Sequence, residues 1–303
     1  MDKCYIKAAL FLLNLFAYMN NNALATELAP KKSFIKSLFK KSVNKNNDVT
    51  SPNNISNKID EPSDPLICTN PDEIKKVEKL MSEAIEKLQE HGIHSNDYSL
   101  YQHYDDDTNV YYKKYKHLDI QKIDTKVYNT DKYEDVINRL FTLNDEKHYG
   151  YLLVKGKIVR EYNPNLVMIQ HRYINLQGFK GYFYAIAGKH EVSEDTTVIA
   201  LASANINDYN EHDQNFYRNS IIESANSFET EVNSEKDIRK GLLNKMYIHL
   251  SGYIIKKKSQ HIQVTSIHSM EMDTRNAPKP IDKEFTSDRL IIMVHAKLDF
   301  SRK

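Results

Sequence analysis

Apolar residues recur at helical spacing in the first part of the folded region. They are Ile74, Val77, Met81, Ala84, Ile85 and Leu88. Steps of three and four residues put such side chains on one face of a helix. Asn70 and Pro71 suit the N-cap and the first helical position, Glu73 gives the pattern of a capping box, and Gly92 is a usual C-terminal stop. The pattern predicts an amphipathic helix that packs on another element.

Segments rich in Val, Ile and Tyr follow this helix and are typical of strands. The predicted strands are Tyr98–Tyr104, Val110–Tyr115, Ile120–Tyr128, Lys157–Tyr162, Leu166–Tyr173, Gly181–Lys189, Thr196–Ser203, Lys245–Lys256 and His261–Met270. The acidic run Asp105–Asp107 is predicted to be a turn, since it lacks the spaced ligands and the glycine of a calcium loop.

A second helix is predicted over Asp131–Phe141, and a helical turn around Glu235–Lys240 in an otherwise polar, irregular stretch. Ser287–Phe300 fits either a closing amphipathic helix or a further strand. The element order predicts an α+β fold, with one predominantly antiparallel sheet and helices segregated to one face or end.

Charge and motifs exclude several function classes. The 303 residues carry 42 Lys and Arg against 41 Asp and Glu, so the chain lacks the cationic excess of a general nucleic-acid binder. We find no zinc-ligand spacing, nucleophile elbow, phosphate loop or paired-carboxylate motif. The sequence therefore predicts a non-catalytic protein without a metal or a cofactor.

The N-terminus has the pattern of a signal peptide. Lys3 and Lys7 flank a short basic region, Ala8–Met19 is almost wholly apolar, and Ala23–Ala25 supplies a small-x-small cleavage site. The apolar run is shorter than the roughly 20 residues that span a bilayer as a helix. We predict a signal peptide over residues 1–25 and hence secretion; an uncleaved interfacial anchor is the alternative.

A polar spacer over residues 26–65 is predicted to be mostly disordered, and a folded domain over residues 66–303 follows it. Lys31–Lys45 is basic without an acid, and its apolar residues sit near helical spacing, so it suits either an anionic membrane surface or a solvated leader. After cleavage Cys68 is the single cysteine, which predicts a domain without an internal disulfide.

Two segments near the C-terminus resemble a known family. Lys245–Ile255, with Ser251-Gly252 at its centre, and Val264–Met270, followed by Asp273, are similar to the closing strand pair of StAR-related lipid-transfer (START) domains. Further blocks resemble the fam-a proteins of rodent malaria parasites, which carry a START domain. These blocks are Cys68–Pro71, Tyr162–Gln170, Ser193–Thr197, Ser203–Asp208 and Ser224–Phe228.

The resemblance implies a helix-grip fold, in which a curved antiparallel sheet wraps a C-terminal helix around a lipid cavity. It further implies phospholipid, with phosphatidylcholine favoured, as cargo; transient peripheral contact with membranes; and export to the parasitophorous vacuole or host cell. We expect a monomer. The alternatives are a non-transferring host-interaction protein on this scaffold, and a helix-grip enzyme acting on lipid.

Candidate lipid contacts follow from the needs of a phosphocholine headgroup, namely a cation for phosphate and aromatic faces for the ammonium. For the headgroup they are Arg160, Arg172, Tyr162, Tyr184 and Tyr247. Met168, Leu250 and Ile254 are candidates for the apolar lining of the lipid cavity. Arg172 is slightly favoured over Arg160 as the phosphate ligand. Each arginine also fits the role of a surface charge on a strand, and each tyrosine that of an ordinary core residue. The sequence alone does not show which face of the sheet each strand residue points to.

Two departures from the START pattern bear on cavity closure and headgroup choice. The tail from Ser287 is short, since about fourteen helical residues reach only about 21 Å, and no glycine follows Asp273. The acid that choline-lipid members carry on the second helix falls at Asn138 here.

Overall fold

The computed structural model describes residues 66–93, 97–143, 146–149, 152–174, 179–213, 217–272, 290 and 292–300. The predicted signal peptide, the spacer and Asp273 lie outside these residues.

The long helix α3 (Pro71–Ile93) begins as its sequence predicts. The Asn70 side-chain oxygen accepts hydrogen bonds from the backbone N–H groups of Asp72 and Glu73, at 3.0 and 3.3 Å, and is the N-cap. The Glu73 carboxylate does not close a capping box. It accepts hydrogen bonds from Arg160 at 2.6 Å and Tyr162 at 2.9 Å, and so ties the start of the helix to the sheet.

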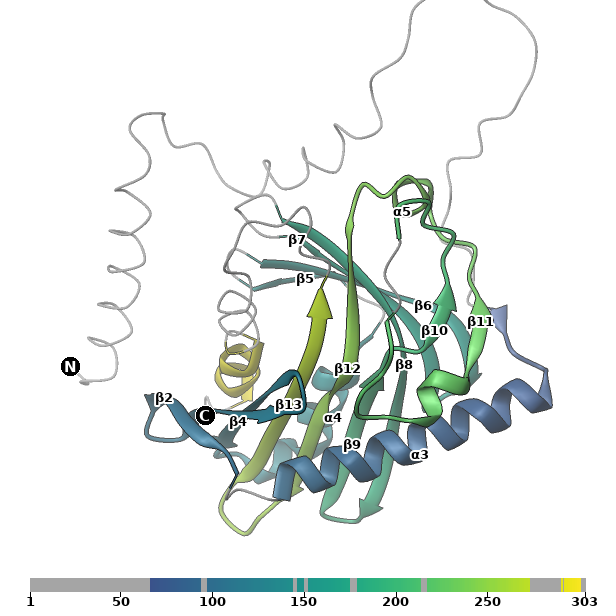
Figure 1. Cartoon of the computed structure of the whole chain (residues 1–303). Helices are drawn as coiled ribbons and strands as arrows, with labels where there is room; N and C mark the ends of the chain where they lie inside the picture. The colour runs from purple at the N-terminus through teal and green to yellow at the C-terminus, as the bar shows by residue number, and fades with distance from the viewer. Residues whose placement is uncertain are drawn as a thin grey trace, which may run out of the picture. The chain divides into compact units, whose positions relative to one another are not determined.

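One large curved sheet forms the body of the domain (Figure 1). Its strands follow the order β1-β6-β7-β8-β9-β12-β13-β4-β3-β2, and β5 pairs with β6. The strands are β1 (Leu66–Ile67), β2 (Ser99–Asp105), β3 (Thr108–Tyr115), β4 (Leu118–Val127), β5 (Glu146–Tyr149), β6 (Leu152–Asn163), β7 (Leu166–Ile174), β8 (Lys180–Ser193), β9 (Thr196–Ala202), β12 (Asn244–Lys257) and β13 (Ile262–Met272). All nine predicted strands are present, and those that follow one another in this order pair antiparallel; a short contact of β8 with β12 is parallel. The short β1, which pairs parallel with β6, and β5 were not predicted.

Two shorter helices were also expected. The helix α4 (Tyr133–Phe141) follows a 3-10 turn at Thr130–Lys132, and α5 (Lys236–Arg239) is the predicted helical turn. Residues 292–300 are helical, which decides between the two alternatives for the tail. The described residues 292–300 of this C-terminal helix span about 13 Å.

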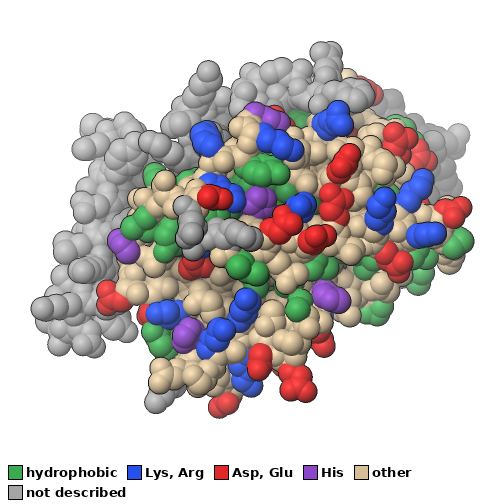
Figure 2. Space-filling model, turned by 60° about the horizontal axis from the view of Figure 1, so that its bottom comes forward, with side chains coloured by type: hydrophobic (Ala, Val, Ile, Leu, Met, Phe, Trp, Pro, Cys, Tyr) green, Lys and Arg blue, Asp and Glu red, His purple; other side chains and the backbone are tan. Residues whose placement is uncertain are grey.

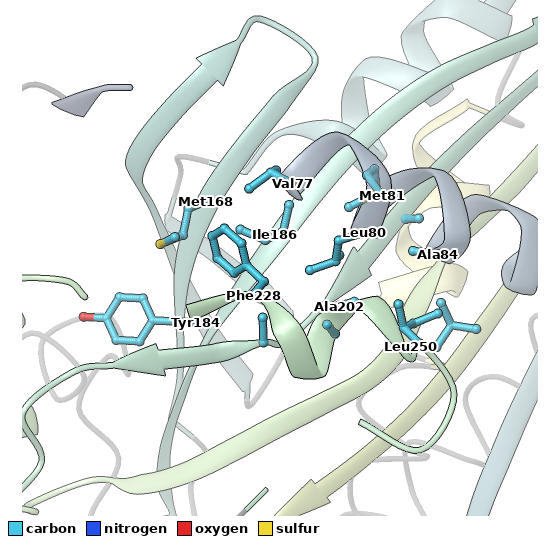
Figure 3. Close-up of a cluster of buried hydrophobic side chains, with 14 of the residues drawn as sticks. Val77, Leu80, Met81, Ala84, Met168, Tyr184, Ile186, Ala202, Phe228 and Leu250 are labelled. Atoms are coloured by element: carbon cyan, nitrogen blue, oxygen red, sulfur yellow. The ribbon is translucent and has the colours of Figure 1, made fainter. Parts of the chain in front are cut away.

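The sheet separates two hydrophobic cores, because successive strand residues point to opposite faces. Met168 and Ala200 pack with α3 in one core, which Figure 3 shows in close-up. Their neighbours Ile169 and Ile199 face the other core, with α4 and with Met293 of the C-terminal helix. We call these the α3 face and the α4 face of the sheet.

The segment between β9 and β12 is more ordered than its polar composition indicates. It contains the parallel pair β10 (Asn205–Asn207) and β11 (Glu229–Glu231), and a 3-10 turn at Ser224–Ser227. Ile222 and Phe228 are buried in the core of the α3 face. The segment is also held to α3, because the Glu83 carboxylate accepts hydrogen bonds from the backbone N–H groups of Glu223 and Ser224.

A buried histidine fastens this segment to β12. The His249 side chain is fully buried, and its Nδ1 accepts the backbone N–H of Ser220 at 3.2 Å. Its Nε2 lies 3.1 Å from the Glu271 carboxylate, so Nε2 carries the proton and donates it. Burial lowers the pKa of His249 more than the Glu271 contact raises it, which keeps the ring neutral.

Stability should therefore fall when His249 has to be protonated. The unfolded ring takes up its proton near pH 6.5, whereas the folded ring does so at lower pH, so the stabilisation is complete above pH 6.5 and declines below it. We expect the unfolding free energy to drop by up to about 1.4 kcal/mol per pH unit in this window. Denaturant titration between pH 7 and pH 5 measures the slope. His249→Gln should flatten it and the exposed control His190→Gln should not; equal slopes in both variants would contradict the assignment.

Among the helices of the described residues, none is long and apolar enough to cross a membrane. On the surface shown in Figure 2, acidic and basic side chains are interspersed.

Candidate ligand pocket

A small pocket lies on the α4 face, between the sheet, α4 and the C-terminal helix. Its volume is about 70 Å³. The lining residues are Arg139, Leu140, Thr142, Leu143, Val154, Gly156, His171, Tyr173, Phe183, Leu201, Ser251, Tyr253, Ile292 and Ala296. Strands β6 to β9 and β12 form its floor, and Ile292 and Ala296 close it from the C-terminal helix.

Aromatic and aliphatic side chains make up most of the wall. Tyr173 and Phe183 are stacked across β7 and β8, with ring centroids 5.9 Å apart. The His171 ring lies 5.4 Å from the Phe183 ring, and its Nε2 is 3.3 Å from the Leu143 carbonyl oxygen. Since a carbonyl only accepts, His171 donates at Nε2. A wall of this kind suits an apolar group of a ligand, or a group that binds to aromatic rings.

An ion pair joins the two helices at the pocket. Arg139 of α4 places Nε 3.2 Å from the carboxylate of Asp299 on the C-terminal helix. Both side chains are partly exposed, at 28% and 45%, so the pair stabilises the closed arrangement by no more than about 1 kcal/mol. A second tether holds the same helix: Lys297 lies 2.9 Å from Asp105 in the β2–β3 turn, and its side chain is 14% exposed.

One polar pair sits within the sheet wall. Ser251 of β12 and His268 of β13 are directly opposed, and Ser251 Oγ lies 3.0 Å from His268 Nδ1. Ser251 lines the pocket, so this pair offers a hydrogen-bonding group on an otherwise apolar surface.

The residues that the sequence singled out lie elsewhere. Five of them, Tyr162, Met168, Tyr184, Leu250 and Ile254, belong to the core of the α3 face, opposite the pocket. Met168, Tyr184 and Leu250 are part of the core drawn in Figure 3, and Ile254 belongs to the same core. Tyr247 is buried and stacks on Tyr217 with centroids 5.0 Å apart. The pocket lining and the predicted set share no residue.

Both predicted phosphate ligands are paired with carboxylates. Arg172 contacts Asp237 at 2.6 Å and Glu235 at 3.1 Å. Burial lowers the pKa of Arg172, but the hydrogen bonds and charges of Asp237 and Glu235 together outweigh it, and the pKa is raised. Arg160 binds Glu73, and its second nitrogen donates to the Glu231 carbonyl oxygen at 2.9 Å. These arginines hold α3 and α5 to the sheet in this structure.

Parity explains why the pocket residues were missed. His171 and Tyr173 alternate with Gln170 and Arg172 on β7, and the two pairs face opposite sides of the sheet. The sequence contains both sets, but only the packing of α3 decides which set faces the pocket. The signal that was overlooked is Arg139, a cation at the end of a predicted amphipathic helix.

The described residues contain no cluster of three or more His, Cys, Asp or Glu placed to hold a metal ion. Cys68 is a half-buried free thiol.

No protein-family model and no curated protein matches this chain. Solved structures do. Human StAR-related lipid transfer protein 5 superposes with a TM-score of 0.52 at 8% identity, over 75% of this chain and 96% of that one. Human STARD10 superposes with a TM-score of 0.48 at 10% identity, over 71% and 79%. The first likeness shows the fold: this chain has a START-like helix-grip fold with an open, curved sheet, as its sequence led us to expect.

Proposed function

We propose that this protein binds a phospholipid on the α4 face of its sheet and carries it between membranes, with phosphatidylcholine favoured. The observation that carries the proposal is a largely apolar pocket that the C-terminal helix closes against the sheet and α4. The names of the START-fold structures, which are lipid-transfer proteins, support it.

The free energy that holds a phospholipid in its bilayer sets how much apolar surface a carrier must provide. About thirty methylenes hold a phospholipid in its bilayer by on the order of 20 kcal/mol, so a carrier must offer comparable apolar cover. Ligand pockets usually enclose about 300 Å³ or more, whereas this one encloses about 70 Å³. We infer that the C-terminal helix moves away from the sheet when lipid enters, and that the acyl chains take the place of its buried Met293.

The Arg139–Asp299 pair favours a zwitterionic headgroup. A lipid phosphate that binds Arg139 breaks the ion pair between Arg139 and Asp299 and leaves the Asp299 carboxylate without a cation. A quaternary ammonium in the same headgroup supplies a new cation for that carboxylate. Tyr173 and Tyr253 supply aromatic faces nearby for that ammonium. Asp299 thereby fills the role of the acid that the second helix lacks at Asn138.

Arg139→Ala should lower transfer of phosphatidylcholine between vesicles by about tenfold or more, since a hydrogen bond to a charged group contributes about 1.5–3 kcal/mol. Transfer of diacylglycerol, which has no phosphate, should change little. The control is the exposed Arg218→Ala. Transfer by Arg139→Ala at the parent rate would refute the assignment.

The same assay addresses catalysis. We propose that the protein is not an enzyme, so the lipid should be recovered unchanged. The Ser251–His268 pair is the group that a lipid hydrolase would use as nucleophile and base. Lysolipid or free fatty acid that appears in proportion to protein and disappears in Ser251→Ala would favour the enzyme.

The leader and the resemblance to fam-a proteins support secretion of a monomeric carrier and export toward the host cell. N-terminal sequencing of the secreted product should show that it begins at Thr26. A product that still begins at Met1 would contradict this part of the proposal.

A further inference from the structure

A second, polar groove shares no lining residue with the pocket on the α4 face. It is bounded by Leu66 of β1 and Arg160 of β6 on one side, and by the segment between β10 and β12 on the other. Its volume is about 820 Å³. The remaining lining residues are Tyr209, Asn210, Glu211, Glu231, Val232, Asn233 and Arg239.

Tyr209 is held in an unusual conformation at this groove. Its φ of 56° lies in the left-handed region, which a bulky residue adopts at a cost in energy. Its hydroxyl donates a hydrogen bond to the Glu231 carboxylate, and its backbone N–H donates to the Asn207 side chain at 3.1 Å. The side chain is nevertheless 47% exposed. The fold therefore fixes an aromatic ring at the surface instead of burying it, and such strain concentrates where ligands bind.

The polar lining argues for an uncharged ligand. Its lining has two arginines, Arg160 and Arg239, and two glutamates, Glu211 and Glu231, so its formal charges cancel. Arg160 is bound to Glu73 and Thr230, and Arg239 donates to the Ser234 carbonyl oxygen and to the Asn233 side chain. Both guanidinium groups are therefore already hydrogen-bonded within the protein.

The backbone argues against an extended peptide. The neighbouring edge strand β1 has only two residues, and the Glu231 carbonyl oxygen already accepts from Arg160. Few main-chain groups are left for strand addition.

We propose that this groove binds a neutral, polyhydroxylated ligand, that is, a glycan chain. A sugar ring lies against the fixed face of Tyr209, because a rigid tyrosine offers a large amphipathic contact at small entropic cost. Hydroxyl groups, which both donate and accept, are matched by the Glu211 carboxylate and the Asn233 amide at the groove wall. The proposal does not depend on lipid binding.

The test is calorimetric titration of the full secreted chain with a panel of neutral oligosaccharides: a mannotriose, a chitotriose and an N-acetyllactosamine. At least one should bind, and Tyr209→Ala should weaken that binding by about tenfold or more. Tyr209→Asn tolerates the left-handed conformation and should also lose binding without lowering the melting temperature.

A matched control is available. Tyr128 is likewise 52% exposed, and its hydroxyl donates to the Asp107 carboxylate at 2.6 Å, but it lies outside the groove. Tyr128→Ala should leave glycan binding intact, and lipid retention should be unchanged in every variant. Binding of none of the oligosaccharides, or equal affinities of the Tyr209 and Tyr128 variants, would overturn the proposal; so would binding of acidic peptides in their place.

Discussion

Ala296→Trp should abolish retention of lipid. Ala296 lies on the C-terminal helix, is 7% exposed and points into the pocket between the sheet and α4. An indole there fills the pocket of about 70 Å³ and makes apolar contacts that an entering acyl chain would have to break. Native mass spectrometry of the purified protein, followed by lipid extraction, should detect phospholipid with the parent and none with the variant.

The matched control for this experiment is on the same helix. Leu298 is 46% exposed, so Leu298→Trp adds the same group outside the pocket. It should retain lipid like the parent. Loss of lipid in both variants would mean that the helix tolerates no substitution, and full retention in Ala296→Trp would place the ligand elsewhere.

Gly252→Ala should destabilise the domain by about 3 kcal/mol or more, at the upper end for overpacking. A Cβ at this position would lie 2.0 Å from the Ile199 carbonyl oxygen and 3.0 Å from Ala200 Cα, in the middle of the β9–β12 pair. Both obstacles are backbone atoms of a central strand, so neither can turn aside. Denaturant unfolding measures the loss.

Gly92→Ala is the control for that substitution. Its Cβ would clash with Ile254 Cδ1 at 2.2 Å, the end of a flexible side chain, and would meet Ile254 Cγ1 and Thr265 Cγ2 at ordinary contact distances of 3.6 and 3.8 Å. Because alanine favours the helix over glycine by up to about 1 kcal/mol, this variant should be close to neutral. A similar loss in both variants would show that the strand contact is not the cause.

Local patterns predicted the elements of this fold, and long-range packing decided their faces. Nine strands were recognisable because they are long and rich in Val, Ile and Tyr. The strand β1, with two residues, has no pattern to detect. Asp208 illustrates a harder case: it resembles a loop residue, yet it is buried against Tyr182 and Lys245. The identity of a polar residue does not show whether it is buried against a partner in the fold or exposed to solvent.

The site was harder to predict than the fold for a related reason. Alternation shows that His171 and Arg172 point in opposite directions, but not which of them shares a face with α3. The register shift between Ile248 and Leu250 also breaks the alternation along β12, next to Tyr247. Carboxylates from distant segments, Glu73 and Asp237, then neutralise the arginines that a headgroup would have needed.

If the α4 face binds cargo as proposed, two cores on one sheet separate the demands of folding from those of cargo. The α3 face holds α3 and the β9–β12 segment in place, whereas the α4 face has a short helix and the pocket. Residues on opposite faces share few partners, so substitutions on them should act almost additively. Pocket residues such as Leu201 and Ile292 could therefore change to suit a different ligand while the scaffold beneath them stays intact. A family built on this plan can diversify its ligands without losing its fold.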